Sequence, residues 1–207
     1  MLRYKMPLKI LIQLIPWLLV LLLALVIILP ACSSKPDTVK RVNEYRNALS
    51  GTDGNLLPGG NPLEKEAIGK FTEFLQRIGD KKFIEENTAR VYASDAYLND
   101  TIVTHHGPDE IKAYFLETSE TMDTYEVTIE DIASSGAEHY VRWTMVFSAP
   151  RLNGGKPVHS LGMSHVRFNP EGQVTMHQDF WDSGTNIYGQ IPVLGGAIES
   201  IRRRFEK

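Results

Sequence analysis

Residues 174–182 read Val-Thr-Met-His-Gln-Asp-Phe-Trp-Asp, and their alternation predicts a β-strand. One face of this strand carries His177, Asp179 and Trp181. A solvated face seldom needs a tryptophan, and a core face seldom tolerates an aspartate unless it is paired or hydrogen-bonded. The mixture is typical of the wall of a half-apolar pocket, so we expect this strand to line a ligand site.

The N-terminus has the pattern of a secretory signal. Three basic side chains precede an apolar run at residues 10–28, and Leu29-Pro30-Ala31-Cys32 follows the run. Residues 29–32 resemble the lipobox of bacterial lipoproteins. We therefore expect residues 1–31 to be a signal peptide with a lipobox that ends at Cys32. The alternative is an uncleaved transmembrane anchor, since the run is about long enough to span a bilayer.

The cysteine content favours the lipoprotein. Cys32 is the only cysteine in the chain, so an extracytoplasmic domain has no internal disulfide partner for it. The resemblance implies that Cys32 carries acyl chains such as palmitate, which anchor the protein to a membrane of the bacterial cell envelope. Ser33 after the cysteine, rather than an aspartate, implies the outer membrane, facing the periplasm.

The charge balance excludes one class of partner. Removal of residues 1–31 changes the formal net charge from −3 to −6, because that segment carries three positive side chains and no acidic one. The only basic cluster is Arg202-Arg203-Arg204 near the C-terminus. Nucleic acid is therefore not an expected partner.

The mature chain divides into a spacer and one domain. Residues 32–61 contain several serines, prolines and glycines and predict a flexible tether, although residues 39–49 could form a short helix. Residues 62–207 have the length of a single domain. Their N-terminal part shows helical apolar spacing over residues 63–78, a second helix after Asp80 and a third after Gly107-Pro108.

The C-terminal part of the domain shows strand patterns instead. Alternating residues predict strands at 125–130, 138–147 and 158–168, with a bend or bulge at Gly162. Residues 169–172, Asn-Pro-Glu-Gly, predict a hairpin turn into the strand at 174–181, and a last amphipathic helix follows at 198–205. Helices followed by a meander predict an α+β fold, with N-terminal helices on one face of a curved antiparallel sheet.

Several short stretches in this order resemble the NTF2-like superfamily of cone-shaped domains, which includes ketosteroid isomerases, SnoaL-like polyketide cyclases and limonene epoxide hydrolase. The matching stretches are residues 71–80, residues 94–100, His106-Gly107 with Ile111 and Phe115, and residues 166–172 leading into 177–181. The resemblance covers residues 62–207. It implies the cone fold but no particular reaction, because this fold hosts enzymes and binding modules alike.

The resemblance assigns roles to individual positions. Asp100 falls where the isomerases keep their general base, and Asp179 falls where SnoaL-like cyclases keep an acid–base aspartate. The oxyanion hole of the isomerases does not carry over, since Thr72 and Ser164 occupy its two positions. The expected catalytic residues are Asp100, Asp179 and His177, and the expected ligand-pocket residues are Trp181, Tyr97, His106, Phe115 and Ser164.

Two function classes follow. If Asp100 and Asp179 share an apolar cup, they can perform acid–base chemistry on a small apolar molecule, with His177 orienting Asp179 or moving a proton. The other class is a non-catalytic lipoprotein domain that binds a ligand or an envelope partner. We expect no cofactor and no metal, because His105 and His106 point opposite ways on extended chain and no paired zinc-ligand spacing is present. The sheet face around Trp143 is a candidate homodimer surface.

Overall fold

The computed structural model describes residues 37–206. Contacts divide the chain into two units, Met1–Asn43 and Glu44–Lys207. The structure describes residues 37–43 of the first unit, which contain the first turns of helix α2 (Thr38–Thr52). At the start of this helix the amide of Lys40 donates to Asp37 Oδ1 at 3.0 Å. The signal peptide, the lipobox and Cys32 lie outside the described residues. The helices and strands after α2 belong to the second unit.

After α2, three further helices precede the longest strands of the sheet. Helix α3 (Glu64–Gln76) buries Phe71 and Phe74 on the apolar stripe that the sequence shows. Asp80 caps α4 (Lys81–Val91), because its Oδ1 accepts from the amide of Phe83 at 3.1 Å. Helix α5 (Gly107–Thr121) has a proline in its first turn, where the missing amide hydrogen costs no hydrogen bond.

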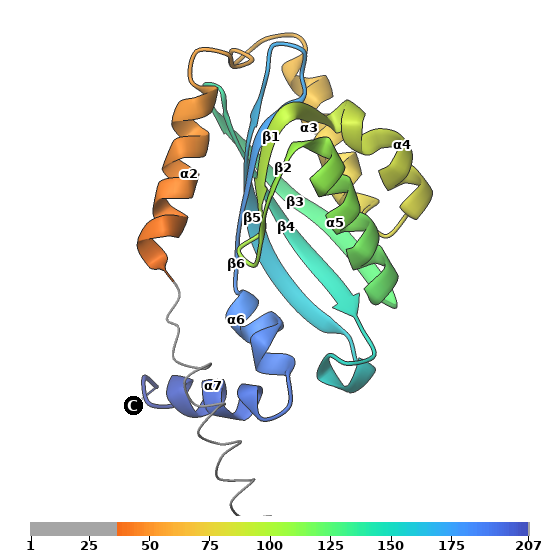
Figure 1. The fold of residues 1–207 in the computed structure, drawn as a ribbon, viewed down its shortest axis with the longest axis vertical. Coiled ribbons are helices and arrows are strands. Elements are labelled where there is room, and N and C mark those ends of the chain that lie inside the picture. The colour runs from red at the N-terminus through yellow and green to blue at the C-terminus, as the bar shows by residue number, and fades with distance from the viewer. Residues whose placement is uncertain (1–36, 207) are drawn as a thin grey trace, which may run out of the picture. The chain divides into compact units, whose positions relative to one another are not determined.

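The sheet contains six strands in the order β2-β1-β6-β5-β4-β3. Their bounds are β1 Tyr92–Asn99, β2 Thr104–His106, β3 Thr124–Ser135, β4 Glu138–Ser148, β5 Val158–Phe168 and β6 Val174–Trp181. Adjacent strands are antiparallel except β1 and β6, which are parallel, so the sheet is mixed. Figure 1 shows α3, α4 and α5 gathered on one face of the curved sheet. The expected α+β cone is confirmed, but its sheet is mixed rather than antiparallel throughout, because β1 pairs with β6 in parallel.

The expected bulge at Gly162 is not present. Gly162 pairs in regular register with Trp143 on β4 and with Trp181 on β6. A β-carbon at position 162 would lie 2.4 Å from Cη2 of Trp143. Glycine is required here because the indole of Trp143 crosses the backbone of β5 closely.

The start of the domain differs from the expected tether over residues 32–61. Residues 38–52 form α2, and the compact unit begins at Glu44 rather than near residue 62. Leu57 belongs to the hydrophobic core at 1% exposure. The sequence pattern misses this docking because most of it is polar: Arg167 on β5 donates to the carbonyl of Leu49 at 2.7 Å and to Asp53 at 2.9 Å.

The C-terminal segment forms α6 (Ser183–Asn186), a short 3₁₀ turn η2 (Tyr188–Gln190) and α7 (Leu194–Arg202). Helix α7 begins and ends earlier than the expected range of residues 198–205, and it buries none of its residues. Among residues 37–206, no helix combines the length and the apolar composition that crossing a membrane requires.

Candidate functional site

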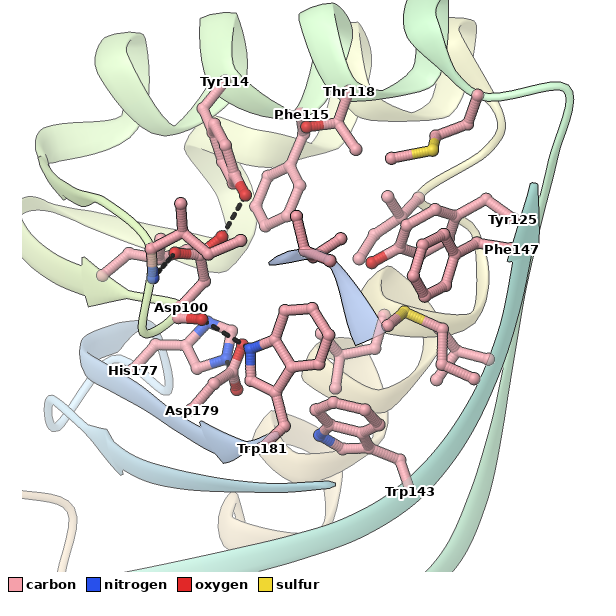
Figure 2. Close-up of a pocket in the computed structure, with 18 residues that line it drawn as sticks. Asp100, Tyr114, Phe115, Thr118, Tyr125, Trp143, Phe147, His177, Asp179 and Trp181 are labelled. Atoms are coloured by element: carbon pink, nitrogen blue, oxygen red, sulfur yellow. Dashed lines mark hydrogen bonds and ion pairs between the residues drawn. The ribbon is translucent and has the colours of Figure 1, made fainter. Parts of the chain in front are cut away.

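A cavity of about 110 Å³ lies between the helical layer and the concave face of the sheet. Asp100 and Asp179 supply its carboxylates and His177 its imidazole, and Figure 2 shows these three side chains together on one side. The other lining residues are apolar, aromatic or hydroxyl-bearing: Leu75, Ile78, Leu98, Ile102, Tyr114, Phe115, Thr118, Met122, Tyr125, Val127, Trp143, Met145, Phe147, Trp181 and Ile187. The structure therefore brings Asp100, Asp179 and His177 to one cavity, as the sequence predicts.

Strand alternation places His177, Asp179 and Trp181 on the cavity face of β6. Asp179 Oδ1 accepts from Ser164 Oγ at 2.5 Å and lies 2.8 Å from His177 Nε2. Within residues 37–206 these are the hydrogen bonds of the carboxylate, and both use Oδ1. Oδ2 is therefore available to a molecule in the cavity.

The donors around His177 fix its tautomer. The Ser164 hydroxyl hydrogen is used on Asp179, and a carboxylate only accepts, so His177 Nε2 must carry the hydrogen that it shares with Asp179. The Tyr92 hydroxyl lies 3.0 Å from Nδ1 of His177. Burial, together with the nearby Asp179 charge, raises the pKa of Tyr92 well above its usual value, so the phenol keeps its proton and donates to Nδ1. Tyr92, His177 and Asp179 form a continuous hydrogen-bonded chain.

Ser164 links this hydrogen-bonded chain to Trp143. The indole nitrogen Nε1 of Trp143 donates to Ser164 Oγ at 3.0 Å, and Ser164 is completely buried. We expected Ser164 to line the cavity, but it is not among the lining residues. It instead donates to the carboxylate of Asp179, which does line the cavity. The sequence identifies the residue and misses its role, because the role depends on the register Ser164↔Asp179 between β5 and β6.

Asp100 follows β1 and is held in a tight turn. Its Oδ1 accepts from the amides of Ile102 and Val103, each at 2.9 Å, and its Oδ2 accepts from the hydroxyl of Tyr114. The carbonyl oxygen of Asp100 also accepts from Nε1 of Trp181 at 2.6 Å. Both carboxylate oxygens are thus occupied by protein donors, which favours a positioning role for Asp100 over that of a free base.

Tyr125 lies on the opposite wall, with its hydroxyl toward the cavity (Figure 2). Burial raises its pKa far above 10, and the negative charges of Asp179 and Asp100 raise it further. The phenol therefore stays protonated at neutral pH and can donate a hydrogen bond to a ligand.

Two expected pocket residues lie elsewhere. Tyr97 and His106 are register partners on β1 and β2, and the Tyr97 hydroxyl donates to Gln178 Oε1 at 3.1 Å. Gln178 points to the face opposite His177 and Asp179, because neighbouring side chains of β6 alternate. Tyr97 and His106 therefore do not line the cavity, whereas the buried Phe115 of α5 does, as expected.

The expected homodimer stays a prediction, but the side chain of Trp143 does not belong to its surface. Trp143 is 5% exposed and lines the cavity, so the sheet face around it is interior. Within the part of the chain that the structure describes, no group of three or more His, Cys, Asp or Glu side chains is placed to hold a metal ion.

Sequence reasoning missed Tyr92, Tyr114 and Tyr125. Tyr92 begins β1, and its partner His177 is 85 residues away along the chain. Tyr114 lies in the helix that the sequence predicts after Gly107-Pro108, and Tyr125 lies in the strand that it predicts at residues 125–130. The hydroxyl groups of Tyr92 and Tyr114 gave no local signal of function, since each donates to a residue supplied by another element.

Comparisons with known proteins agree with this architecture. The family model of the SnoaL-like domain matches residues 71–177, just over half of the chain. The chain therefore belongs to the SnoaL-like family, within the NTF2-like fold. The match includes Asp100 and ends at His177, two residues before Asp179. A comparison with curated protein sequences gives no match.

Three solved structures illustrate the likeness, each at a TM-score of 0.52 and 16% identity. The first is an M. tuberculosis epoxide hydrolase of the type that resembles limonene epoxide hydrolase, and the match covers 69% of this chain and 96% of that chain. A protein with a ketosteroid isomerase-like fold from Catenulispora acidiphila, in complex with trimethylamine, covers 59% and 93%. An NTF2-like protein of unknown function from Burkholderia pseudomallei covers 63% and 98%. At this identity the likeness shows the fold alone.

Proposed function

We propose that the chain is a membrane-tethered, extracytoplasmic SnoaL-like enzyme that performs cofactor-free acid–base chemistry on a small, mainly apolar molecule. One observation carries the proposal: Asp179 presents a free Oδ2 to an apolar cavity while Ser164 and His177 hold its Oδ1. A carboxylate fixed in this way and surrounded by apolar walls is a suitable general base.

The geometry supports a balanced proton transfer. Asp179 Oδ2 takes a proton from a carbon next to a carbonyl group, and the electron pair of that C–H bond moves onto the carbonyl oxygen as an enolate. The protonated Tyr125 donates a hydrogen bond to this oxygen. Asp179 then returns the proton to another carbon or to the oxygen. The same base can instead take a proton from water as the water attacks an electrophilic carbon.

Asp100 contributes as a positioning residue. Its carboxylate orients Tyr114, and its carbonyl oxygen orients the indole of Trp181, so both rings are fixed on the cavity wall. The Tyr92 hydroxyl acts through His177 in the same manner. His177 can share charge with Asp179 during the transfer because Nε2 stays in hydrogen-bond contact with Oδ1.

The test uses two small probes: exchange of the α-hydrogens of cyclohexanone in D2O, and hydrolysis of cyclohexene oxide to its diol. We expect the full chain to accelerate one of them and Asp179→Asn to lose at least a hundredfold in rate, because one general base contributes about 10²–10⁴-fold. Asp95→Asn is the matched control, since Asp95 is exposed on β1. Equal rates for the wild type and Asp179→Asn would refute the assignment of the base.

The non-catalytic alternative has one observation in its favour. Protein donors occupy both oxygens of Asp100, which leaves a single free carboxylate oxygen rather than an acid–base pair. If neither probe is turned over while ligands bind in the cavity, the domain is a binding module.

The tether is a separate part of the proposal and rests on the sequence alone. Cys32 in a lipobox-like stretch supports acylation and attachment to the outer membrane, facing the periplasm. In a bacterial host, the wild type is expected to incorporate an alkyne analogue of palmitate and to sediment with membranes. Cys32→Ser should lose the label, and retention of the label would place the acyl chain elsewhere.

A further inference from the structure

We infer that the ligand of this cavity is a small organic cation, an ammonium group on a compact apolar body. The inference rests on the proposal that this cavity is the ligand site, and it adds the charge of the molecule that binds there.

The charges of the cavity have one sign. Asp100 and Asp179 both line it, and none of its 18 lining residues is a lysine or an arginine. His177 is the one other titratable nitrogen there, and it is already engaged by Tyr92 and Asp179. An anionic ligand would therefore be repelled by two carboxylates inside an apolar enclosure, where charges interact more strongly than in water. A cation would be attracted by both.

Aromatic rings provide the rest of the wall. Six of the lining residues are aromatic apart from His177, and Figure 2 shows them on several sides of the cavity: Tyr114, Phe115, Tyr125, Trp143, Phe147 and Trp181. The face of an aromatic ring attracts a cation within about 6 Å of its centroid, most strongly when the ring is tryptophan and water is excluded. Phe147 and Trp143 are 1% and 5% exposed, so these rings offer desolvated surfaces.

The free carboxylate oxygen completes the site. Asp179 Oδ2 has no hydrogen-bond partner among residues 37–206, whereas the Oδ1 atom has two. A protonated amine can donate to this oxygen, and a quaternary ammonium group can rest against it and the rings. A neutral molecule of the same shape would leave the charge of Asp179 without a counterion in the cavity.

The test compares two molecules of equal shape by titration calorimetry on the full chain. Choline carries a quaternary nitrogen, and 3,3-dimethylbutan-1-ol has a carbon in its place. We expect choline to bind at least tenfold more tightly, and 3,3-dimethylbutanoate to bind more weakly than either. Equal affinity for choline and its neutral isostere, or tighter binding of the anion, would overturn the inference.

Variants locate the preference. Phe147→Leu should reduce the ratio of choline to neutral-isostere affinity, because it removes a ring from the wall. Phe180→Leu is the matched control, since Phe180 is 46% exposed and lies on the opposite face of β6. Asp179→Asn should lower choline affinity without weakening the neutral isostere. A ratio that is the same in all three variants and in the wild type would show that the preference arises outside this cavity.

The outcomes separate this inference from the proposed function. Preference for choline without turnover of any probe would support the cationic ligand and remove the enzyme. Turnover that depends on Asp179, together with no preference for choline over its isostere, would support the enzyme and remove the cationic ligand.

Discussion

Gly162→Ala tests the close crossing of β5 by Trp143. A β-carbon at position 162 would lie 2.4 Å from Cη2, 2.5 Å from Cζ2 and 2.9 Å from Cζ3 of Trp143. Carbon atoms in favourable contact are about 3.5–4.0 Å apart, so the indole has to retreat by roughly 1 Å. The ring is buried and its Nε1 donates to Ser164, so this retreat strains the core and weakens that hydrogen bond.

The magnitude follows from three contributions. Overpacking of a core costs about 1–3 kcal/mol, and loss of the hydrogen bond to Ser164 adds about 1 kcal/mol. Alanine recovers about 0.5–1 kcal/mol because it loses less backbone entropy on folding than glycine. We expect Gly162→Ala to lower the free energy of unfolding by about 1–3.5 kcal/mol, a large share of the roughly 5–15 kcal/mol of an ordinary domain.

The assay is equilibrium unfolding in urea, followed by far-ultraviolet circular dichroism. Gly69→Ala in α3 is the control, since a β-carbon there has nothing within 4 Å, and it should stabilise the protein by about 0.5–1 kcal/mol. In a Trp143→Phe background, which removes the colliding atoms, Gly162→Ala should cost much less. If alanine costs as much in that background as in the wild type, the collision is not the cause.

Three further predictions concern pH and the docking of α2. Burial lowers the pKa of His139 and of His165 below 6.5. The unfolded chain therefore binds more protons than the folded one, and the free energy of unfolding falls as the pH drops below about 6.5. Urea unfolding at pH 7.5 and 5.5 should show this fall, and an equal free energy of unfolding at both pH values would contradict it. Arg167→Met removes the donor to the carbonyl of Leu49 and the ion pair with Glu138, so it should destabilise the protein by about 3 kcal/mol. Hydrogen exchange in α2 should accelerate from residue 44 onward, whereas faster exchange in α5 alone would show that Arg167 does not hold α2. Burial raises the pKa of Tyr97 to about 12 and raises that of Tyr125 further. The stability that these neutral phenols contribute below pH 10 should be lost as the pH rises through their raised pKa values. An ultraviolet titration in which all tyrosines of the folded protein ionise near pH 10 would refute this.

Local patterns predicted much of the fold and the charged side of the cavity. Alternation alone placed His177, Asp179 and Trp181 on one face of β6, and Pro108 after Gly107 marked the start of α5. These features depend on neighbouring residues only, so the sequence contains them directly.

Features that depend on distant pairing were not predictable in the same way. The parallel pairing of β1 with β6 places Leu98 beside His177, and this register sends Tyr97 to the outer face. The docking of α2 depends on a polar contact of Arg167 with the backbone of the helix, and no apolar periodicity in the sequence predicts such a contact. The resemblance to NTF2-like domains supplied the cone fold but did not indicate the hydroxyl partners of Asp100 and His177.

The positions of Trp143 and Trp181 also have an optical consequence. Both tryptophans of the described residues stand on the wall of the same cavity, and the indole nitrogen of each is held by a hydrogen bond. A guest that enters the cavity changes the surroundings of both fluorophores at once, and a guest that binds on the outer face of the sheet leaves them unchanged. The intrinsic tryptophan fluorescence of the domain should therefore report whether the cavity is occupied, without an attached dye.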